Sequence, residues 1–475
     1  MDRILPATVW PIGLVLACVL VEAIQLRVGI DDLDEGYFVQ QGARVLHGEV
    51  PFRDFETLYS PGLAYLHAGL FALLGGPSLL APRIVALLAR LALALVLVAM
   101  TLPLVRNPLW AAVPALLLLV GLDDAPQRWE PHPGWLSSLF AVVAAWCLSQ
   151  RREQRAGFWL VAAGLAAAAA YAFKQNTGVF ILGAILVWCL ANNAADKRLA
   201  CRISGPWRVP LVAFAAASLV WLVPLAVLTK DQLPRLGPLV GVVNQAGLFS
   251  APEPTLLIPL AALAGGVWLV RRDSHPNLRW LLLSGVALLL TQVPRMDTLH
   301  LIWSTPILLV LGAVALERVP RPLALISGLL VVALVWPTLS SRLAVVIEPR
   351  ATVADASAPV ETAADIQGAV DDIQQRSRPD EPIFVYPSSP LLYALADRPN
   401  PTRFDHLNPG AANAEQLQAV IEDLQRAHVR VIVVSDFWRN AWGPPGANAV
   451  LEDWINTHYA EVGRHGAYRV LEADL

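Results

Sequence analysis

The stretch LAPRIVALLARLALALVLVAMTLPLV, residues 80–105, decides the fold class. It is longer than the roughly 20 residues that cross the hydrocarbon core of a bilayer, and Arg83 and Arg90 are its only charged side chains. A helix on the surface of a soluble protein would carry a polar face along its whole length. We therefore predict that this stretch is a membrane-spanning helix.

The rest of the chain has the same character. Of its 475 residues, 56% are hydrophobic and 15% are charged, and the mean hydropathy is +0.52. Soluble domains carry about 25% charged residues, so this composition excludes an ordinary soluble protein. The tail differs, because residues 350–475 hold 10 basic and 18 acidic side chains, against 25 and 20 before them. We predict a mainly α membrane domain over 1–340 and a soluble domain over 341–475.

Eleven apolar segments predict about eleven transmembrane helices. They cover residues 8–28, 80–105, 109–122, 135–149, 157–173, 178–191, 209–228, 255–270, 280–293, 301–316 and 323–339. Four connections between them are basic, around residues 151–155, 197–208, 271–279 and 318–321. All four fall on one side if the helices alternate, and Lys and Arg mark the cytoplasmic side. The acidic tail then lies outside the membrane.

Residues 59–74 are apolar too, but counting them as a crossing would put basic connections on both sides. We therefore predict that they form an interfacial helix at the outer surface. Ser60-Pro61-Gly62 suits a helix start with Ser60 as the N-cap and Pro61 in the first turn. The aromatic residues Tyr59, Tyr65 and Phe71 suit interfacial depth.

The outer connections hold most of the polar residues that could carry chemistry. The large first outer loop, 29–79, contains DDLDEGYF at 31–38, PFRDFE at 51–56 and YSPG at 59–62. Later outer connections contain DDAPQRWEPH at 123–132, KQNT at 174–177 and PRMDTLH at 294–300. Helix ends converge in a bundle, so we expect these segments to form one polar cavity. A carboxylate there could deprotonate a hydroxyl, and cations could hold a phosphate.

The first-loop motifs and their order after a first helix resemble the GT-C glycosyltransferases. More narrowly, they are similar to the bacterial branch of the protein O-mannosyltransferase and aminoarabinose-transferase group, glycosyltransferase family 39-like. The resemblance implies a polyprenyl-phosphate-sugar donor and a hydroxyl acceptor on a glycan, lipid or protein. It also implies an inverting reaction at the outer face of the bacterial cytoplasmic membrane, with no nucleotide sugar.

Within this resemblance Asp34 matches the family acid that activates the acceptor, and Arg83 lies where the family commonly has an Arg. The catalytic candidates are Asp34, Glu35, Asp124 and Glu130. The candidates for substrate binding are Arg53, Asp54, Tyr59, Arg83, Arg90, His132, Lys174, Arg295, Asp297 and His300. A divalent cation held by Asp34 with Asp124 or Glu130 is left open, because hard cations need several oxygen ligands.

Each candidate has a structural alternative. Glu35 could pair with a nearby Arg, and Arg53 with Asp54. The turn at Glu130-Pro131-His132 could merely cap a helix. Lys174 could extend to the interface from its helix end, and the cluster around 295–300 could be a self-contained set of ion pairs.

A lipid-linked sugar flippase or transporter is the competing function. Carriers place ionisable groups near the midplane and often contain internal repeats. Here the charges lie at outer helix ends and the sequence has no evident repeat. No basic run or motif indicates nucleic-acid binding, and the four cysteines form no disulfide framework or CxxC site.

The tail alternates predicted helices and strands, which is typical of a small α/β layer domain. We predict a linker at 351–362, helices at 363–375, 391–396, 414–427 and 450–458, and strands at 382–386, 429–435 and 467–471. The segment Asn400-Pro401-Thr402-Arg403 is predicted to face the membrane domain.

Overall fold

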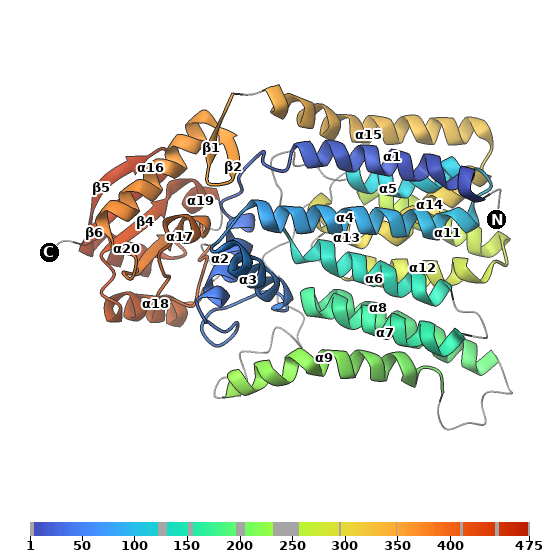
Figure 1. Ribbon diagram of the computed structural model, residues 1–475, viewed down its shortest axis with the longest axis horizontal. Helices are drawn as coiled ribbons and strands as arrows, with labels where there is room; N and C mark the ends of the chain where they lie inside the picture. Colours follow the sequence, from blue (N-terminus) through green and yellow to red (C-terminus); the bar gives the residue numbers. More distant parts are fainter. Residues whose placement is uncertain are drawn as a thin grey trace.

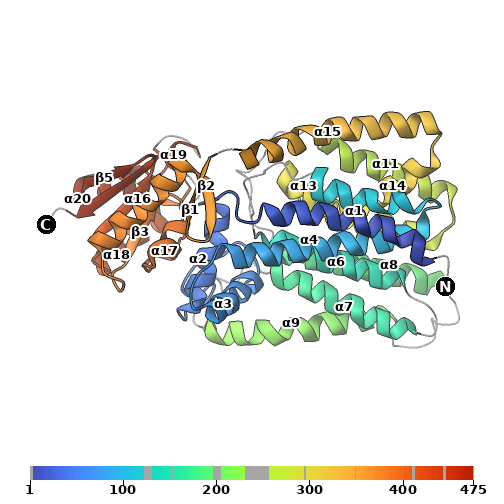
Figure 2. The same cartoon turned by 45° about the horizontal axis from the view of Figure 1, so that its top comes forward.

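The computed structural model describes residues 4–121, 131–150, 155–195, 205–230, 256–293, 296–347, 349–408, 412–441 and 446–473. They form a bundle of long, roughly parallel helices with a smaller α/β domain at one end (Figure 1). The view turned by 45° shows the same two-part arrangement, with the first loop between the two parts (Figure 2).

The bundle helices follow the apolar segments of the sequence. They are α1 (Ile4–Ile24), α4 (Leu80–Thr101), α6 (Pro133–Ser149), α7 (Ala156–Phe173), α8 (Gln175–Ala195), α9 (Arg208–Leu228), α11 (Leu257–Arg272), α12 (Pro276–Leu290), α13 (Thr298–Ser304), α14 (Pro306–Arg318) and α15 (Arg321–Ile347). Among the described residues, four helices are long and apolar enough to cross a membrane: Leu80–Leu104, Ala156–Phe173, Gln175–Asn192 and Arg208–Leu228. The number of crossings beyond these four stays a prediction.

Two predicted single helices are interrupted. Residues 109–122 correspond to the short turns η2 (Pro108–Ala112), α5 (Val113–Leu116) and η3 (Leu117–Gly121), which follow η1 (Leu102–Leu104). The predicted helix at 301–316 is divided between α13 and α14. Prolines lie at the first turns of η2, α5 and α14, where the missing N–H does no harm. Apolarity therefore identified these regions but not their internal breaks.

Small side chains allow close packing around α7. Ala163, Ala167 and Ala170 are fully buried in the bundle core. A Cβ on Gly164 would collide with the backbone of Pro210 at the start of α9. Small residues let membrane helices approach closely and gain packing contacts, so the Ala-rich sequence of α7 makes it a central helix rather than a peripheral one.

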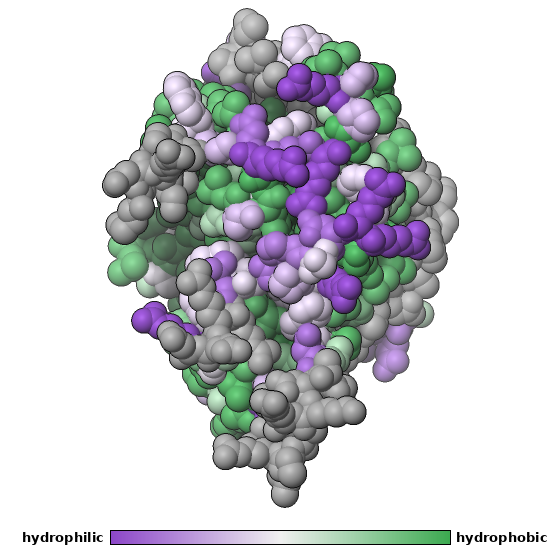
Figure 3. Space-filling model, turned by 90° about the vertical axis from the view of Figure 1, so that its right-hand side faces the viewer, coloured by the Kyte–Doolittle hydropathy of each residue, from purple (hydrophilic) through white to green (hydrophobic). Residues whose placement is uncertain are grey.

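A band of hydrophilic residues crosses the end of the bundle away from the α/β domain, with hydrophobic patches beside it (Figure 3). The ends of α11 and α14 and the start of α12 contribute Arg271, Arg272, Arg279 and Arg318 there. Arg318, the last residue of α14, forms an ion pair with Asp273, which directly follows α11. Asn277 donates to the Ser149 carbonyl at the end of α6, with 3.3 Å between the atoms. The described residues at the connections after α6, α11 and α14 therefore share one end of the bundle, as their spacing predicts.

The first loop folds into two helices, α2 (Asp34–Leu46) and α3 (Gly62–Leu74). The predicted start of α3 is wrong in detail. Pro61 is the N-cap residue, with no side-chain capping bond, and the Ser60 hydroxyl is buried without a hydrogen-bond partner. The Ser60 N–H instead donates to Gln175 Oε1 at 3.1 Å. Tertiary contact with α8 thus replaces the local cap.

Helix α3 has one buried and one exposed apolar face. Leu63, Ala64 and Phe71 are buried, whereas Leu73 is 85% exposed and Leu74 is 61% exposed. Exposed leucines at the end of a helix beside the bundle fit a membrane interface, where apolar side chains enter the acyl boundary. The interfacial position of α3 relative to a bilayer stays a prediction.

The α/β domain has a four-stranded sheet in the order β3-β4-β6-β5. Its strands are β3 (Ile383–Tyr386), β4 (Val431–Ser435), β5 (Tyr459–His465) and β6 (Tyr468–Ala473), and β3 runs parallel to β4. Alternate residues of β4 face opposite layers, with Val431 and Val433 on one core and Ile432 and Val434 on the other. The helices are α16 (Val360–Arg376), α17 (Leu391–Ala396), α18 (Ala414–Arg426), α19 (Asp436–Ala441) and α20 (Ala449–His458). The predicted layer architecture is therefore confirmed.

The predicted linker at 351–362 is wrong. It contains a hairpin of β1 (Arg350–Val353) and β2 (Ala356–Pro359), followed directly by α16. Ser357 hydrogen-bonds backbone groups of Arg27 and Gly29 at the end of the first helix. The strands are only four residues each and are held by this contact, which local sequence cannot reveal. Strand β5 and helix α19 are further elements that the sequence pattern does not predict.

Gly36 lets α2 pack directly on α17. A Cβ at this position would lie 2.6 Å from the Leu391 nitrogen and 2.7 Å from its Cβ. We expect Gly36→Ala to destabilise the domain contact by about 1–3 kcal/mol, as overpacking does, seen as a lower melting temperature and faster proteolysis of the tail. The exposed helical Gly69 has open space where a Cβ would lie, with no heavy atom within 4 Å, so Gly69→Ala is the matched control. Equal stability of both variants would contradict the tight contact.

Candidate active site

Polar and aromatic side chains from five segments meet where the bundle approaches the first loop. The segments are the start of α2, the turn around Tyr59, the start of α6, the junction of α7 and α8, and α13. Phe38 of α2 lies with its ring centroid 5.9 Å from Tyr59 and 5.3 Å from His132. His132 in turn stacks on Trp303 of α13 at 3.7 Å. The sequence-predicted convergence of the outer helix ends is therefore found for these segments.

Asp34 is the first residue of α2 and is partly exposed. Asp31 fixes this helix start, because its Oδ1 accepts from the N–H groups of Leu33 at 3.0 Å and Asp34 at 3.2 Å. A helix N-terminus stabilises the ionised form of a carboxylate. Asp34 thus lies at a defined and charge-favouring position, with access to solvent.

Glu35 lies beside Asp34 but has a different environment. It is fully buried and forms a two-point ion pair with Arg83 of α4, with N–O distances of 2.6 and 2.7 Å. Arg83 also donates to the carbonyls of Leu26 and Gly29. Burial raises the pKa of Glu35, and the facing guanidinium opposes that shift. This pair attaches α2 to α4, so the structure supports the pairing alternative for Glu35.

Asp32 attaches the same segment to the α/β domain. Its carboxylate accepts from the Tyr468 hydroxyl at 2.6 Å, the Trp438 indole at 3.2 Å and the Ser389 hydroxyl. Burial and the Asp32 charge raise the pKa of Tyr468 well above its usual range, so the phenol stays a donor at physiological pH. Asp32 and Glu35, which flank Asp34 in the sequence, are therefore held by different domains.

Lys174 points into the bundle rather than outward to the interface. It is 5% exposed, and its Nζ lies 3.5 Å from Gln292 Oε1. The same Nζ lies 5.2 Å from the Trp303 ring centroid and 5.9 Å from that of Tyr59. These distances are typical of cation–π contacts. The Lys174 ammonium group therefore lies inside the site, next to aromatic side chains of the first loop and α13.

Tyr59 and His132 connect the first loop to α6. His132 Nε2 lies 3.1 Å from the Tyr59 hydroxyl, and its Nδ1 accepts from the Gly134 N–H at 2.8 Å. His132 is the N-cap residue of α6, so the predicted capping turn is present. Because one nitrogen caps the helix, the ring orientation is fixed and Nε2 faces the Tyr59 hydroxyl.

The other predicted binding residues that the structure describes near α13 and α4 are Asp297, His300 and Arg90, and they lie in two different places. Asp297 caps α13 and its Oδ1 lies 2.6 Å from His300 Nδ1, so these two form the local pair expected as an alternative. His300 nevertheless touches the site, with its ring 5.5 Å from Trp303. Arg90 lies deeper, paired with Glu22 of α1 at 2.7 Å and placed over the Trp135 ring. The Trp135 ring lies 6.3 Å from that of Trp303, so Arg90 borders the cluster around Lys174.

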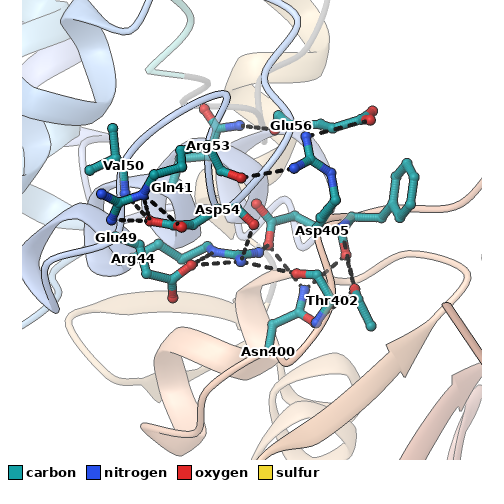
Figure 4. A network of polar contacts seen from close by, with 12 residues as sticks. Gln41, Arg44, Glu49, Val50, Arg53, Asp54, Glu56, Asn400, Thr402 and Asp405 are labelled. Atoms are coloured by element: carbon teal, nitrogen blue, oxygen red, sulfur yellow. Dashed lines mark hydrogen bonds and ion pairs between the residues drawn. The ribbon is translucent and has the colours of Figure 1, made fainter. Parts of the chain in front are cut away.

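Arg53 and Asp54 form a local ion pair at 2.7 Å. Burial raises the pKa of Asp54, but the hydrogen bonds from Arg53 and the Val50 N–H outweigh this and lower it overall. Both residues belong to a network that joins the first loop to the segment 400–405 (Figure 4). The predicted approach of Asn400-Pro401-Thr402-Arg403 to the membrane domain is found there, since Arg403 donates to the Arg53 carbonyl at 2.8 Å.

Three candidates, Asp124, Glu130 and Arg295, lie outside the described residues. Within the part of the chain that the structure describes, no three His, Cys, Asp or Glu side chains gather as metal ligands. Sequence reasoning missed Trp303 and Gln292, which flank Lys174. Tryptophans are common interfacial anchors in membrane proteins, and no sequence signal distinguishes Trp303 from them.

No family model matches the chain, and no curated protein matches its sequence. Solved structures do match. ArnT from Cupriavidus metallidurans bound to undecaprenyl phosphate aligns with a TM-score of 0.62 at 13% identity, over 98% of this chain and 97% of that one. The Archaeoglobus fulgidus oligosaccharyltransferase in complex with Zn and sulfate gives 0.54 at 12% identity, over 96% and 73%. The mycobacterial arabinofuranosyltransferase AftD gives 0.52 at 15% identity, over 98% and 40%.

These neighbours are GT-C proteins, and the alignment with ArnT covers nearly the full length of both chains. The chain therefore has the GT-C fold, here a helical bundle followed by an α/β domain. The fold expected from the motifs at 31–62 is confirmed. At such low identity the likeness establishes the fold alone.

Proposed function

We propose that this protein is an inverting glycosyltransferase that moves a sugar from a polyprenyl-phosphate carrier to a hydroxyl acceptor. The observation that carries the proposal is the position of Lys174, buried between Trp303, Tyr59 and Gln292 beside the loop that contains Asp34. The GT-C fold supports it, since the similar ArnT structure contains undecaprenyl phosphate. The active site and α/β domain lie on the outer side of the bacterial cytoplasmic membrane.

The proposed chemistry divides between an acid residue and a cation. Asp34 accepts the proton of the acceptor hydroxyl while the oxygen attacks the anomeric carbon, as a general base does. The bond from that carbon to the lipid phosphate breaks, and the electron pair stays on the phosphate oxygen. Lys174 stabilises the negative charge of this leaving group. Attack from the face opposite the phosphate inverts the anomeric centre.

In this proposal the other predicted site residues line the site or hold its segments in position. Tyr59, His132 and His300 line the same cluster as Lys174. Glu35 and Arg83 position the start of α2, and Arg90 fastens α4 to α1. Arg53 and Asp54 hold the loop that faces the α/β domain.

Replacing Lys174 tests the phosphate-binding part of the proposal. We expect Lys174→Ala to weaken binding of undecaprenyl phosphate to the purified protein by about 10–100-fold, because hydrogen bonds to charged groups contribute roughly 1.5–3 kcal/mol. Lys230→Ala, at an exposed position just after α9, is the matched control and should leave binding unchanged. Equal affinity of both variants for the carrier lipid would remove Lys174 from the site.

A further inference from the structure

His406 of the α/β domain faces the start of α2 across the domain boundary. Its ring centroid lies 4.9 Å from that of Tyr37, with the two planes at 76°. Tyr37 comes one helical turn after Asp34, and residues three apart share a helix face. The His406 ring therefore lies against the side of α2 that begins with Asp34.

The preceding residue fixes His406 in this place. Asp405 is buried and accepts from Arg44 of α2 at 2.8 Å and from Asn400 at 3.2 Å. Arg44 also donates to the Thr402 carbonyl at 3.0 Å. Figure 4 shows how these contacts join the segment 400–405 to the helix. The backbone leading to His406 is thus anchored on the same helix that carries Asp34.

One nitrogen of the His406 imidazole makes no hydrogen bond at this boundary. His406 Nδ1 is buried and has no hydrogen-bond partner, although the residue as a whole is partly exposed. A buried polar atom without a partner is unfavourable, and such groups in a folded protein usually have a function or an unseen partner. A proton or a substrate hydroxyl that arrives during turnover would be such a partner.

We propose that His406 is a positioning residue for the Asp34 base, and that its imidazole accepts the proton that Asp34 takes from the acceptor. This inference rests on the proposed function. The acceptor O–H bond breaks, its electron pair forms the bond to the sugar, and the proton passes from the Asp34 carboxyl to the neutral imidazole. This transfer returns Asp34 to its ionised form, and the imidazolium then releases the proton to water, which restores neutral His406.

The charges around His406 agree with this role. Burial lowers the pKa of His406, while Asp405 and Asp34 oppose that shift. Tyr37 is the third titratable group facing the ring, and burial raises its pKa, so it stays neutral. With a pKa below the usual value of about 6.5, His406 is neutral above that point and able to accept. Turnover should therefore fall as the pH decreases through the pKa of His406.

The test compares the pH profile and chemical rescue of full-length variants in a transfer assay with undecaprenyl-phosphate-sugar. We expect His406→Gln to lower kcat by on the order of 10²-fold, to leave the donor KM unchanged and to lose the acidic limb. We expect added imidazole to restore part of the activity of His406→Ala. His458→Gln, at an exposed residue of the same domain, should behave like wild type.

The outcomes separate the two proposals. Wild-type kcat in His406→Gln, or an unchanged acidic limb without imidazole rescue of His406→Ala, overturns the role of His406 and leaves the glycosyltransferase proposal intact. Absence of transfer by the wild-type protein across a panel of lipid-linked sugars overturns the proposed function, and this inference with it.

Discussion

Asp34→Asn should reduce sugar transfer by about 10²–10⁴-fold, the range that a general base contributes. The amide keeps the shape of the carboxyl and the start of α2, where Asp31 holds the backbone, but it cannot take up the acceptor proton. Binding of the donor lipid should be unchanged, since Lys174 and its neighbours are intact. Single-turnover transfer and lipid binding, measured on the same preparation, check both statements.

A surface carboxylate provides the control for this variant. Asp380 lies on the α/β domain with its side chain 80% exposed, so Asp380→Asn should transfer sugar at the wild-type rate. Wild-type turnover in Asp34→Asn would show that another group is the base. Lost lipid binding in Asp34→Asn would instead indicate that the substitution disturbs the whole site.

The second large effect is expected on stability. Arg83→Leu leaves the Glu35 carboxylate fully buried without its ion-pair partner and deprives two backbone carbonyls of a donor. Breaking a buried pair from one side destabilises a protein by about 3–5 kcal/mol. We expect a clearly lower melting temperature in detergent, together with loss of transfer, because the anchor of α2 on α4 is gone.

Two further variants separate the buried pair from general charge effects. Glu35→Met combined with Arg83→Met should recover much of the lost stability, since apolar replacement of both partners is often neutral. Arg378→Met breaks an exposed pair with Glu381, where Arg378 is 75% exposed, and should change stability by at most about 1 kcal/mol. An Arg83→Leu variant as stable as Arg378→Met would contradict the assigned role of the pair.

The sequence predicts the parts of this fold that depend on local composition. Apolar length locates the bundle helices, and alternation of helix and strand patterns predicts the α/β domain, including α17 at its observed bounds. It cannot predict features created by distant contacts. The Ser60 hydroxyl does not cap α3, and residues 350–359 form a hairpin. Both features follow from packing against segments elsewhere in the chain.

The site shows the same division. Outer helix ends had to converge, so Tyr59, His132 and Lys174 could be placed together from topology. The sequence could not show which cations form structural ion pairs, because the partners are distant in the chain. Arg83 and Glu35 are 48 residues apart, and Arg44 and Asp405 are 361 residues apart. Charge type and helix position were visible in the sequence, but partner choice was not.

The hydrogen bond from Tyr468 to Asp32 has a consequence for biogenesis. Tyr468 lies in β6, and Asp32 precedes Asp34, the proposed base, by two residues. A nascent chain that has formed all its bundle helices still lacks this bond until the α/β domain, which is synthesised last, has folded. Under the proposed function, immature chains would therefore neither consume nor misdirect the lipid-linked sugar.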